Sequence, residues 1–301
     1  MINSHIPVLL NEVLEELDIK KDGIYVDLTL GRAGHSKEIL KKITTGKLIS
    51  FDKDQEAINE SNQILKQINN NYILIKSDFR FAKAKLAEIG ITKVDGILAD
   101  FGVSSPQLDN ANRGFSYSQD CDLDMRMDQD NHLKASDIIN TYSSNEIERI
   151  LIENADVKFA NQIAKAICEN RPINTSFELN ELLKQTLPAK ILREKNPSKA
   201  VFQALRIAVN DELNAIKDFL EDACSLLKPS SKMLFITFHS KEDVIIKKFF
   251  QNLVYQDPKL NKLPIQIKRE WKQKIIFPSE TETQENKRSR SAKLRVITRL
   301  E

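Results

Sequence analysis

The stretch "YVDLTLGRAGHSKEIL" (residues 25–40) begins as a strand and ends as a helix, with two glycines and a histidine in the bend between them. A tight turn at the carboxyl end of a strand, opening into the amino terminus of a helix, is where open α/β sheets usually hold a ligand. Gly31 and Gly34 allow the backbone to turn sharply where a side chain would collide with that ligand. The stretch therefore predicts an α/β sheet with a ligand site at this bend.

The residues around this bend alternate between strand and helix patterns. Short apolar runs rich in β-branched residues predict buried parallel strands at 24–30, 47–52, 72–75 and 94–100. Segments with apolar residues at helical spacing separate them, as in "DQEAINESNQILKQI". This order implies right-handed crossovers and a doubly wound, Rossmann-like parallel sheet.

The pattern changes after Asp100 and returns near residue 199. Residues 101–130 are rich in Ser, Asn, Asp and Gly and predict a long irregular loop, and the signal from 134 to 195 is entirely helical. One long helix over 198–228, strands at 232–239 and 294–300 and a helix between them resume the α/β pattern. We therefore predict a discontinuous sheet domain, residues 1–106 and 199–301, and an inserted loop and helical substrate-recognition domain, residues 107–198.

Composition indicates a globular protein of the cytoplasm. Of 301 residues, 41% are hydrophobic and 29% charged, which is ordinary for a soluble globular chain. No apolar run is long enough for a membrane span, and "MINSHIPVLLNEVLEEL" lacks the pattern of a signal peptide. Three scattered cysteines, Cys121, Cys168 and Cys224, predict reduced thiols rather than disulfides or a zinc site.

Basic residues gather at the carboxyl terminus although the net charge is only +2. Residues 287–301 contain six basic side chains and one acidic side chain. Such a cluster can hold a phosphate backbone, and it can equally be a solvated tail, which composition alone favours.

Three aspartates end predicted neighbouring strands and narrow the choice of ligand. Asp27 ends the first strand and suits the amino group of a methionine, and Asp52, 25 residues later, can accept hydrogen bonds from both ribose hydroxyls of an adenosine. A dinucleotide prefers Gly-x-Gly-x-x-Gly around its pyrophosphate, whereas this bend has two glycines with the bulky Arg32 between them. The pattern favours S-adenosylmethionine over a dinucleotide, and Asp100 would face both cofactor and substrate.

Several long motifs occur in order from His5 to about Val296. They are "HIPVLLNEVLEEL", "DLTLGRAGHS", "DGILADFGVSSPQLD", "RGFSY", "LDMRMD", "FQALRIAVNDEL", "FHSKED" and "RSRSAKLRV". Together they resemble the bacterial 16S ribosomal RNA (cytosine-N4)-methyltransferase family, RsmH or MraW. The resemblance implies a class I S-adenosylmethionine-dependent methyltransferase fold.

The resemblance also implies which residues contact the cofactor. They are Ala33, Gly34 and His35 in the bend, Asp52 at the ribose, and Phe79, Asp100 and Gln107 around the adenine and methionine. Phe81 lies in the same stretch as Phe79 and is the alternative to it. Two positions depart from the family pattern, because Ala33 replaces a common glycine and Phe101 a common leucine.

The implied reaction is methyl transfer to the exocyclic N4 of a cytidine in the decoding centre of 16S rRNA in the small ribosomal subunit. That amine is a poor nucleophile, so the enzyme must align it and accept its hydrogen bonds. Asp100, or a backbone carbonyl of "DFGVSSP", is the predicted acceptor, with no metal, and His239 is predicted to contact the base or relay a proton. Arg113, Phe115 and Arg126 in the long loop are predicted to stack on single-stranded RNA or hold its phosphates.

Two other classes of function stay open at this point. A Rossmann dinucleotide-dependent dehydrogenase fits the predicted sheet, but the bend lacks the third glycine of the dinucleotide-binding pattern. A non-enzymatic RNA-binding ribosome assembly factor is the other alternative, and ribosome binding that does not depend on methylation would distinguish it. The sequence leaves the oligomeric state open, a homodimer included.

Overall fold

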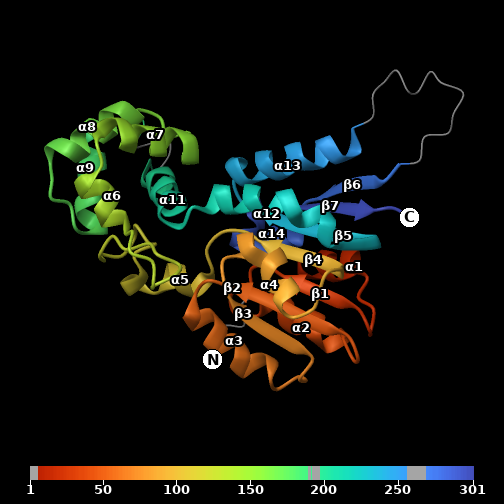
Figure 1. Cartoon of the computed structure of the whole chain (residues 1–301). Helices are drawn as coiled ribbons and strands as arrows, with labels where there is room; N and C mark the ends of the chain where they lie inside the picture. The colour runs from red at the N-terminus through yellow and green to blue at the C-terminus, as the bar shows by residue number, and fades with distance from the viewer. Residues whose placement is uncertain (1–5, 189–190, 192–196, 256–268) are drawn as a thin grey trace, which may run out of the picture. The chain divides into compact units, whose positions relative to one another are not determined.

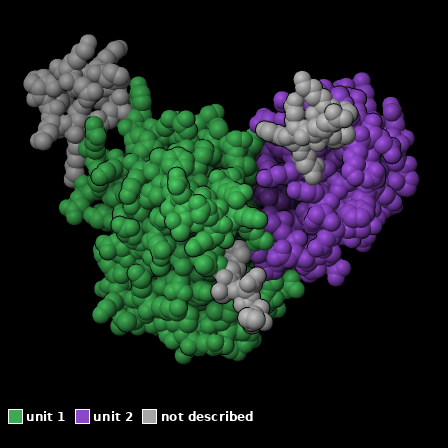
Figure 2. Space-filling view, turned by 180° about the vertical axis from the view of Figure 1, so that it is seen from behind, with its two compact units in different colours: residues 1–102, 215–301 green, residues 103–214 purple. Residues whose placement is uncertain are grey.

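A computed structural model describes residues 6–188, 191, 197–255 and 269–301 of the chain. The chain divides into two compact units, which Figure 2 colours separately. Unit 1 comprises residues 1–102 and 215–301, and unit 2 comprises residues 103–214. The sequence predicted the changes of domain at 106/107 and 198/199.

Unit 1 contains a seven-stranded sheet with the order β3-β2-β1-β4-β5-β7-β6. The strands β1 to β5 pair in parallel, while β7 runs antiparallel to both of its neighbours. The strands are β1 (Ile24–Asp27), β2 (Lys47–Asp52), β3 (Tyr72–Lys76), β4 (Val94–Asp100), β5 (Leu227–Thr237), β6 (Trp271–Ile276) and β7 (Lys293–Arg299). The predicted doubly wound α/β sheet is confirmed.

Successive strand residues point to opposite faces of this sheet, and helices bury both faces. Val26, Ile49 and Ile97 belong to one core, and Tyr25, Leu48 and Leu98 to the other. The helices and 3₁₀ turns of unit 1 are α1 (Leu10–Leu17), α2 (Gly34–Lys42), α3 (Gln55–Leu65), η1 (Phe79–Phe81), α4 (Ala82–Glu88), α12 (Glu212–Leu226), α13 (Ser240–Val254), α14 (Glu280–Glu285) and η4 (Lys287–Ser291). Side chains of α4, α12 and α13 join the first core, and those of α1 and α2 join the second.

Unit 2 is helical and has a core of its own. Its elements are α5 (Ser105–Asp109), η2 (Ala111–Arg113), α6 (Ala135–Thr141), α7 (Ser144–Ala155), α8 (Ala160–Glu169), α9 (Ser176–Thr186) and α11 (Pro197–Asn210). Two aliphatic side chains at its centre, Leu151 and Ile167, are completely buried. Residues of α11 such as Val201 and Leu205 belong to this core, so α11 is part of unit 2 rather than of the sheet unit.

The single long helix predicted over 198–228 is wrong. Two helices, α11 and α12, occupy this stretch, and Asp211 separates them with φ at 50° in the left-handed region. The amphipathic pattern continues through the break and contains no glycine or proline, so no residue pattern predicts the break. A further strand, β6, was also not predicted.

No helix in the described ranges combines the length and the apolar character needed to span a bilayer.

Candidate functional site

Three predicted site residues meet at one edge of the sheet in unit 1. Asp27, Asp52 and Asp100 are the last residues of β1, β2 and β4, which are adjacent strands. We call this edge, where β1, β2, β4 and β5 end, the carboxyl edge. Parallel strands that end at the same edge place their last side chains close to one another, so the three aspartates can contact one ligand.

Asp27 is engaged by the protein itself. It is 1% exposed, and its Oδ1 accepts the backbone N–H of Thr29 at 3.1 Å while its Oδ2 accepts the hydroxyl of Ser36 at 2.7 Å. Burial raises the pKa of the Asp27 carboxyl, and the hydrogen bonds from Ser36 and Thr29 oppose that rise. Asp27 thus holds the start of the bend and the first turn of α2 together.

Asp100 is held by its backbone and leaves its carboxyl group available. Its backbone N–H donates to Thr29 Oγ1 at 2.6 Å, which links it to the Asp27 network. Its side chain is 26% exposed, yet Oδ1 is buried and has no hydrogen-bond partner among the described residues. Burial raises the pKa of Asp100 well above its usual range, and the nearby carboxylates of Asp27 and Glu242 add to that rise. An unpartnered carboxyl oxygen that a ligand can approach is typical of a functional site.

Asp52 closes the other side of the bend. Its Oδ2 accepts the backbone N–H of Gly31 and its Oδ1 that of Asp54, both at 2.9 Å. Burial raises the pKa of Asp52 to about 6, against the effect of these two hydrogen bonds. Each carboxylate oxygen has a second lone pair, so Asp52 retains the capacity to accept hydrogen bonds from a ligand.

The bend turns through two residues in the left-handed region. Gly31 has φ at 49° and Ala33 has φ at 56°, so the alanine that departs from the family pattern occupies a conformation that favours glycine. At Gly34 the constraint is space, because an added Cβ would lie 2.7 Å from Pro7 Cγ. Arg32 forms an ion pair with Glu60 on α3.

His35 connects the bend to Asp100 and to the amino-terminal segment. Its side chain is 6% exposed, its Nε2 lies 3.0 Å from the carbonyl oxygen of Val8, and its Nδ1 lies 3.8 Å from Asp100 Oδ2. Since a carbonyl oxygen only accepts, Nε2 carries the hydrogen of this contact, and Nδ1 is the ring nitrogen that faces Asp100.

Residues 6–9 form a part of this edge that sequence reasoning missed. The backbone N–H of Leu9 donates to Glu282 Oε1 at 2.7 Å, and Asn286 Nδ2 donates to the carbonyl oxygen of Ile6 at 3.1 Å. Residues 6–9 and the segment from Glu282 to Asn286 therefore meet beside the bend. The sequence contained no local signal for this contact, because the partners lie more than 270 residues apart.

The two phenylalanines weighed for the adenine occupy different environments. Phe79 packs against Phe101 and Phe219 with ring centroids 5.8 and 6.2 Å apart, whereas Phe81 is 56% exposed. Phe101, the second departure from the family pattern, also stacks on Phe235 in the core. Phe79 thus lies on an aromatic cluster that reaches the carboxyl edge.

His239 caps a helix at this edge. Its Nδ1 accepts the backbone N–H of Glu242 at 3.5 Å, and its Nε2 lies 3.0 Å from Glu242 Oε1. Glu242, which is 1% exposed, accepts the backbone N–H of Phe238 at 2.9 Å. Sequence reasoning missed Glu242, although its place three residues after His239 follows the spacing of a capping box.

The remaining predicted residues lie in unit 2, where they organise the long segment after β4. Gln107 is 7% exposed and its Oε1 accepts the backbone N–H of Ser104 at 3.1 Å. Arg113 is buried and donates to the carbonyl oxygens of Arg126 and Met127. Phe115 belongs to the core of the unit, and Arg126 forms a bidentate ion pair with Asp124. These contacts leave their predicted roles with the cofactor and RNA untested.

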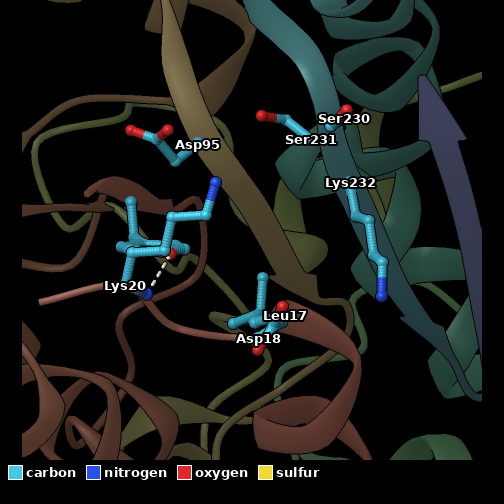
Figure 3. A pocket seen from close by; sticks show the side chains of 8 residues that line it. Leu17, Asp18, Lys20, Asp95, Ser230, Ser231 and Lys232 are labelled. Atoms are coloured by element: carbon cyan, nitrogen blue, oxygen red, sulfur yellow. Dashed lines mark hydrogen bonds between the residues drawn. The ribbon is translucent and has the colours of Figure 1, made fainter. Parts of the chain in front are cut away.

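A small cavity of about 160 Å³ lies at the opposite edge, where β1 and β4 begin (Figure 3). Asp95, Lys20 and Lys232 are among the side chains that line it. It holds none of the predicted site residues. Within the described part of the chain, no group of three or more His, Cys, Asp or Glu side chains is arranged to bind a metal.

Comparison with known proteins identifies the family. The model of the MraW methylase family matches residues 2–300. A ribosomal RNA small subunit methyltransferase H of Metamycoplasma arthritidis is 63% identical over 284 residues, covering 94% of this chain and 99% of the relative. The protein of that name from Mycoplasmopsis agalactiae is 53% identical over 300 residues and all of both chains. A putative methyltransferase of Streptococcus mutans, solved in complex with SAH, aligns over 98% of this chain and 100% of its own, with 13% identity and a TM-score of 0.45.

The family model covers nearly the whole chain, and the two relatives exceed half identity over full-length alignments. The chain belongs to the MraW methylase family, which uses S-adenosylmethionine as the methyl donor.

Proposed function

We propose that the protein methylates the exocyclic N4 of a cytidine in the decoding centre of 16S rRNA, in the cytoplasm, where small subunits assemble. The observation that carries this proposal is the full-length match to the MraW methylase family and to relatives named ribosomal RNA small subunit methyltransferase H. Asp100 at the carboxyl edge supports it, since its buried, unpartnered carboxyl oxygen is available to accept a hydrogen bond from a ligand.

The residues at the carboxyl edge fit S-adenosylmethionine. Asp52 can accept the ribose hydroxyls with its remaining lone pairs, and Asp100 has an unpartnered oxygen for a donor of the methionine part. Phe79 offers an aromatic surface for the adenine. We assign Ala33, Gly34 and His35 to the wall of this site, Asp27 to holding the wall in place, and Gln107 to the cofactor as its family motif implies.

When bound, the cofactor supplies an electrophilic methyl group on its sulfonium. The cytidine amine has a lone pair delocalised into the ring, so it needs an acceptor that draws its hydrogens and directs the lone pair at the methyl. Asp100 is our proposed acceptor. His239 and Glu242 together cap α13 and so fix the end of β5 beside Asp100. Arg113, Phe115 and Arg126 shape the loop that we propose contacts the RNA.

Replacing Asp100 with Asn tests the assignment. Because Asn has an NH₂ in place of one acceptor oxygen, we expect turnover on small subunits to fall about 10²- to 10³-fold. Methyl transfer is measured with radiolabelled S-adenosylmethionine on small subunits, naked rRNA and mature ribosomes, and cofactor binding is measured separately by calorimetry.

Unchanged turnover of the Asp100→Asn protein would remove Asp100 from the reaction. If the wild-type protein binds small subunits and transfers no methyl group to them, the alternative of a non-enzymatic assembly factor replaces the proposed function.

A further inference from the structure

The basic residues near the carboxyl terminus form part of the fold rather than a tail. They lie in η4 and β7, and several of them are engaged within the protein. Lys293 and Arg295 form ion pairs with Asp243, and Arg299 donates to the carbonyl oxygen of Leu227. Arg288 also has a partner in the protein. Lys293 and Arg295 thus join β7 to α13, and Arg299 joins β7 to the start of β5.

Two cations of η4 differ from the others because they face solvent. Lys287 and Arg290 are exposed, and no ion pair or hydrogen bond of the Lys287 ammonium is found among the described residues. Arg290 donates its Nε–H to the carbonyl oxygen of Thr283 at 3.3 Å, which fixes the direction of its side chain. In a 3₁₀ turn, side chains three residues apart lie on the same side, so Lys287 and Arg290 project together.

These two cations lie at the carboxyl edge. β7 begins at Lys293, which pairs with Thr237 at the end of β5, and β5 in turn pairs with the end of β4 at Asp100. Figure 1 shows α14, which directly precedes η4, at this end of the sheet. Phe277, 59% exposed, follows the pair Ile276–Leu294 and so emerges at the same edge.

The segment that carries these cations is rigid. Ser289 is completely buried and donates its hydroxyl to the carbonyl oxygen of Asn286 at 2.8 Å. The side chain of Asn286 accepts the backbone N–H of Arg288 and donates to Ile6. Cations on an ordered backbone lose less conformational entropy on binding than cations of a solvated tail.

We propose that Lys287, Arg290 and Phe277, here called the η4 surface, bind single-stranded RNA beside the methyl-transfer site. The two cations contact phosphates and the ring stacks on a base, the combination that sequence-tolerant RNA-binding surfaces use. Glu280 and Glu285 on the neighbouring α14 are exposed and oppose this binding. The inference rests on the proposed function, because it supplies the RNA contact that this reaction needs.

The test measures binding of a fluorescein-labelled 20-nucleotide single-stranded RNA to the full chain, by anisotropy at several salt concentrations and without cofactor. We expect the double variant Lys287→Ala with Arg290→Ala to bind about tenfold more weakly. Its salt slope should fall by about 1.4, at about 0.7 for each lost contact to a single strand. Phe277→Ala should weaken binding with an unchanged salt slope, and Glu285→Gln should strengthen it.

A matched control replaces Lys20 and Lys21, two exposed lysines that precede β1 at the opposite edge, and should leave the salt slope unchanged. Calorimetry with S-adenosylmethionine verifies that each variant keeps a folded cofactor site. If the Lys287/Arg290 variant binds RNA with the affinity and salt slope of the wild type, the proposal is overturned. An acidic protein would then be the partner to test for the η4 surface. If RNA binding changes as expected while no variant, nor the wild type, methylates small subunits, the η4 surface stands and the proposed function fails.

Discussion

Asp52 connects cofactor binding to pH. Its carboxyl group has a pKa of about 6 in the folded chain, raised by burial from an ordinary value of 3.8. The ribose hydroxyls need its ionised form as an acceptor. At pH 5 only about a tenth of a group with this pKa is ionised, so we expect the Kd for S-adenosylmethionine to be about tenfold higher at pH 5 than at pH 7. Calorimetry across this range measures the change.

The same shift acts on folding with the opposite sign. A carboxyl whose folded pKa is raised destabilises the fold wherever it is ionised, so this contribution is lost as the pH falls through 6 towards 4. Protonation of Asp52 therefore stabilises the fold at low pH. Weaker cofactor binding at pH 5 cannot be due to unfolding caused by Asp52. In Asp52→Asn the pH dependence of the Kd should flatten, and an affinity of the wild type that is constant from pH 5 to 7 would contradict the assignment.

At the residue scale, the sequence predicted which acidic residues lie at the site but not what each does. Asp27, Asp52 and Asp100 follow apolar runs that are easily identified as parallel strands. Asp27 turned out to accept hydrogen bonds from Thr29 and Ser36, while Asp100 keeps an unpartnered oxygen. That difference depends on which hydroxyls the folded chain brings near each carboxylate, and spacing along the sequence does not encode it.

At the scale of the elements, the end of α1 offers a test of backbone strain. Asp18 follows the helix with φ at 47°, and its side chain is exposed. Because glycine adopts this left-handed conformation without a Cβ clash, we expect Asp18→Gly to raise the free energy of unfolding by about 1 kcal/mol. Denaturant unfolding measures it.

Asp22 provides the matched control in the same connection. It is exposed and is not among the described residues with positive φ. Asp22→Gly should therefore relieve no strain, and it should lower the free energy of unfolding by up to about 1 kcal/mol because the unfolded chain gains conformational freedom. A stabilisation of the same size at both positions would show that strain at Asp18 is not the cause.

Elements were predicted well where one strong pattern decides them. β2 and β4 have the bounds that their apolar runs indicated, 47–52 and 94–100. β6 was not predicted because it is an edge strand with the sequence "WKQKII", whose polar residues face solvent. The break at Asp211 was missed because the packing of α11 into unit 2, rather than any residue that breaks helices, ends that helix.

At the scale of the whole molecule, each unit has its own hydrophobic core. Leu151 in α7 and Leu86 in α4 are both completely buried, one in each unit. Replacing Leu151 with Ala should remove about 3 kcal/mol of stability. Because its neighbours lie in unit 2, we expect faster amide hydrogen exchange in α7, α8 and α11 and unchanged protection in β1 and β4.

Leu86→Ala is the reciprocal variant. It should speed amide hydrogen exchange in β1 and β4, while the amides of unit 2 keep their protection from exchange. If either substitution lowers protection equally in both units, the two cores unfold as one cooperative body.

The contact of residues 6–9 with Glu282 and Asn286 beside the bend has a consequence for synthesis on the ribosome. Glu282 and Asn286, the partners of residues 6–9, are translated more than 270 residues after them. β7, which lies inside the sheet between β5 and β6, is made later than every other strand of that sheet. A nascent chain therefore cannot complete the carboxyl edge before residues 282–299 have been made. A product truncated before residue 280 would lack both the hydrogen bonds to residues 6–9 and an interior strand.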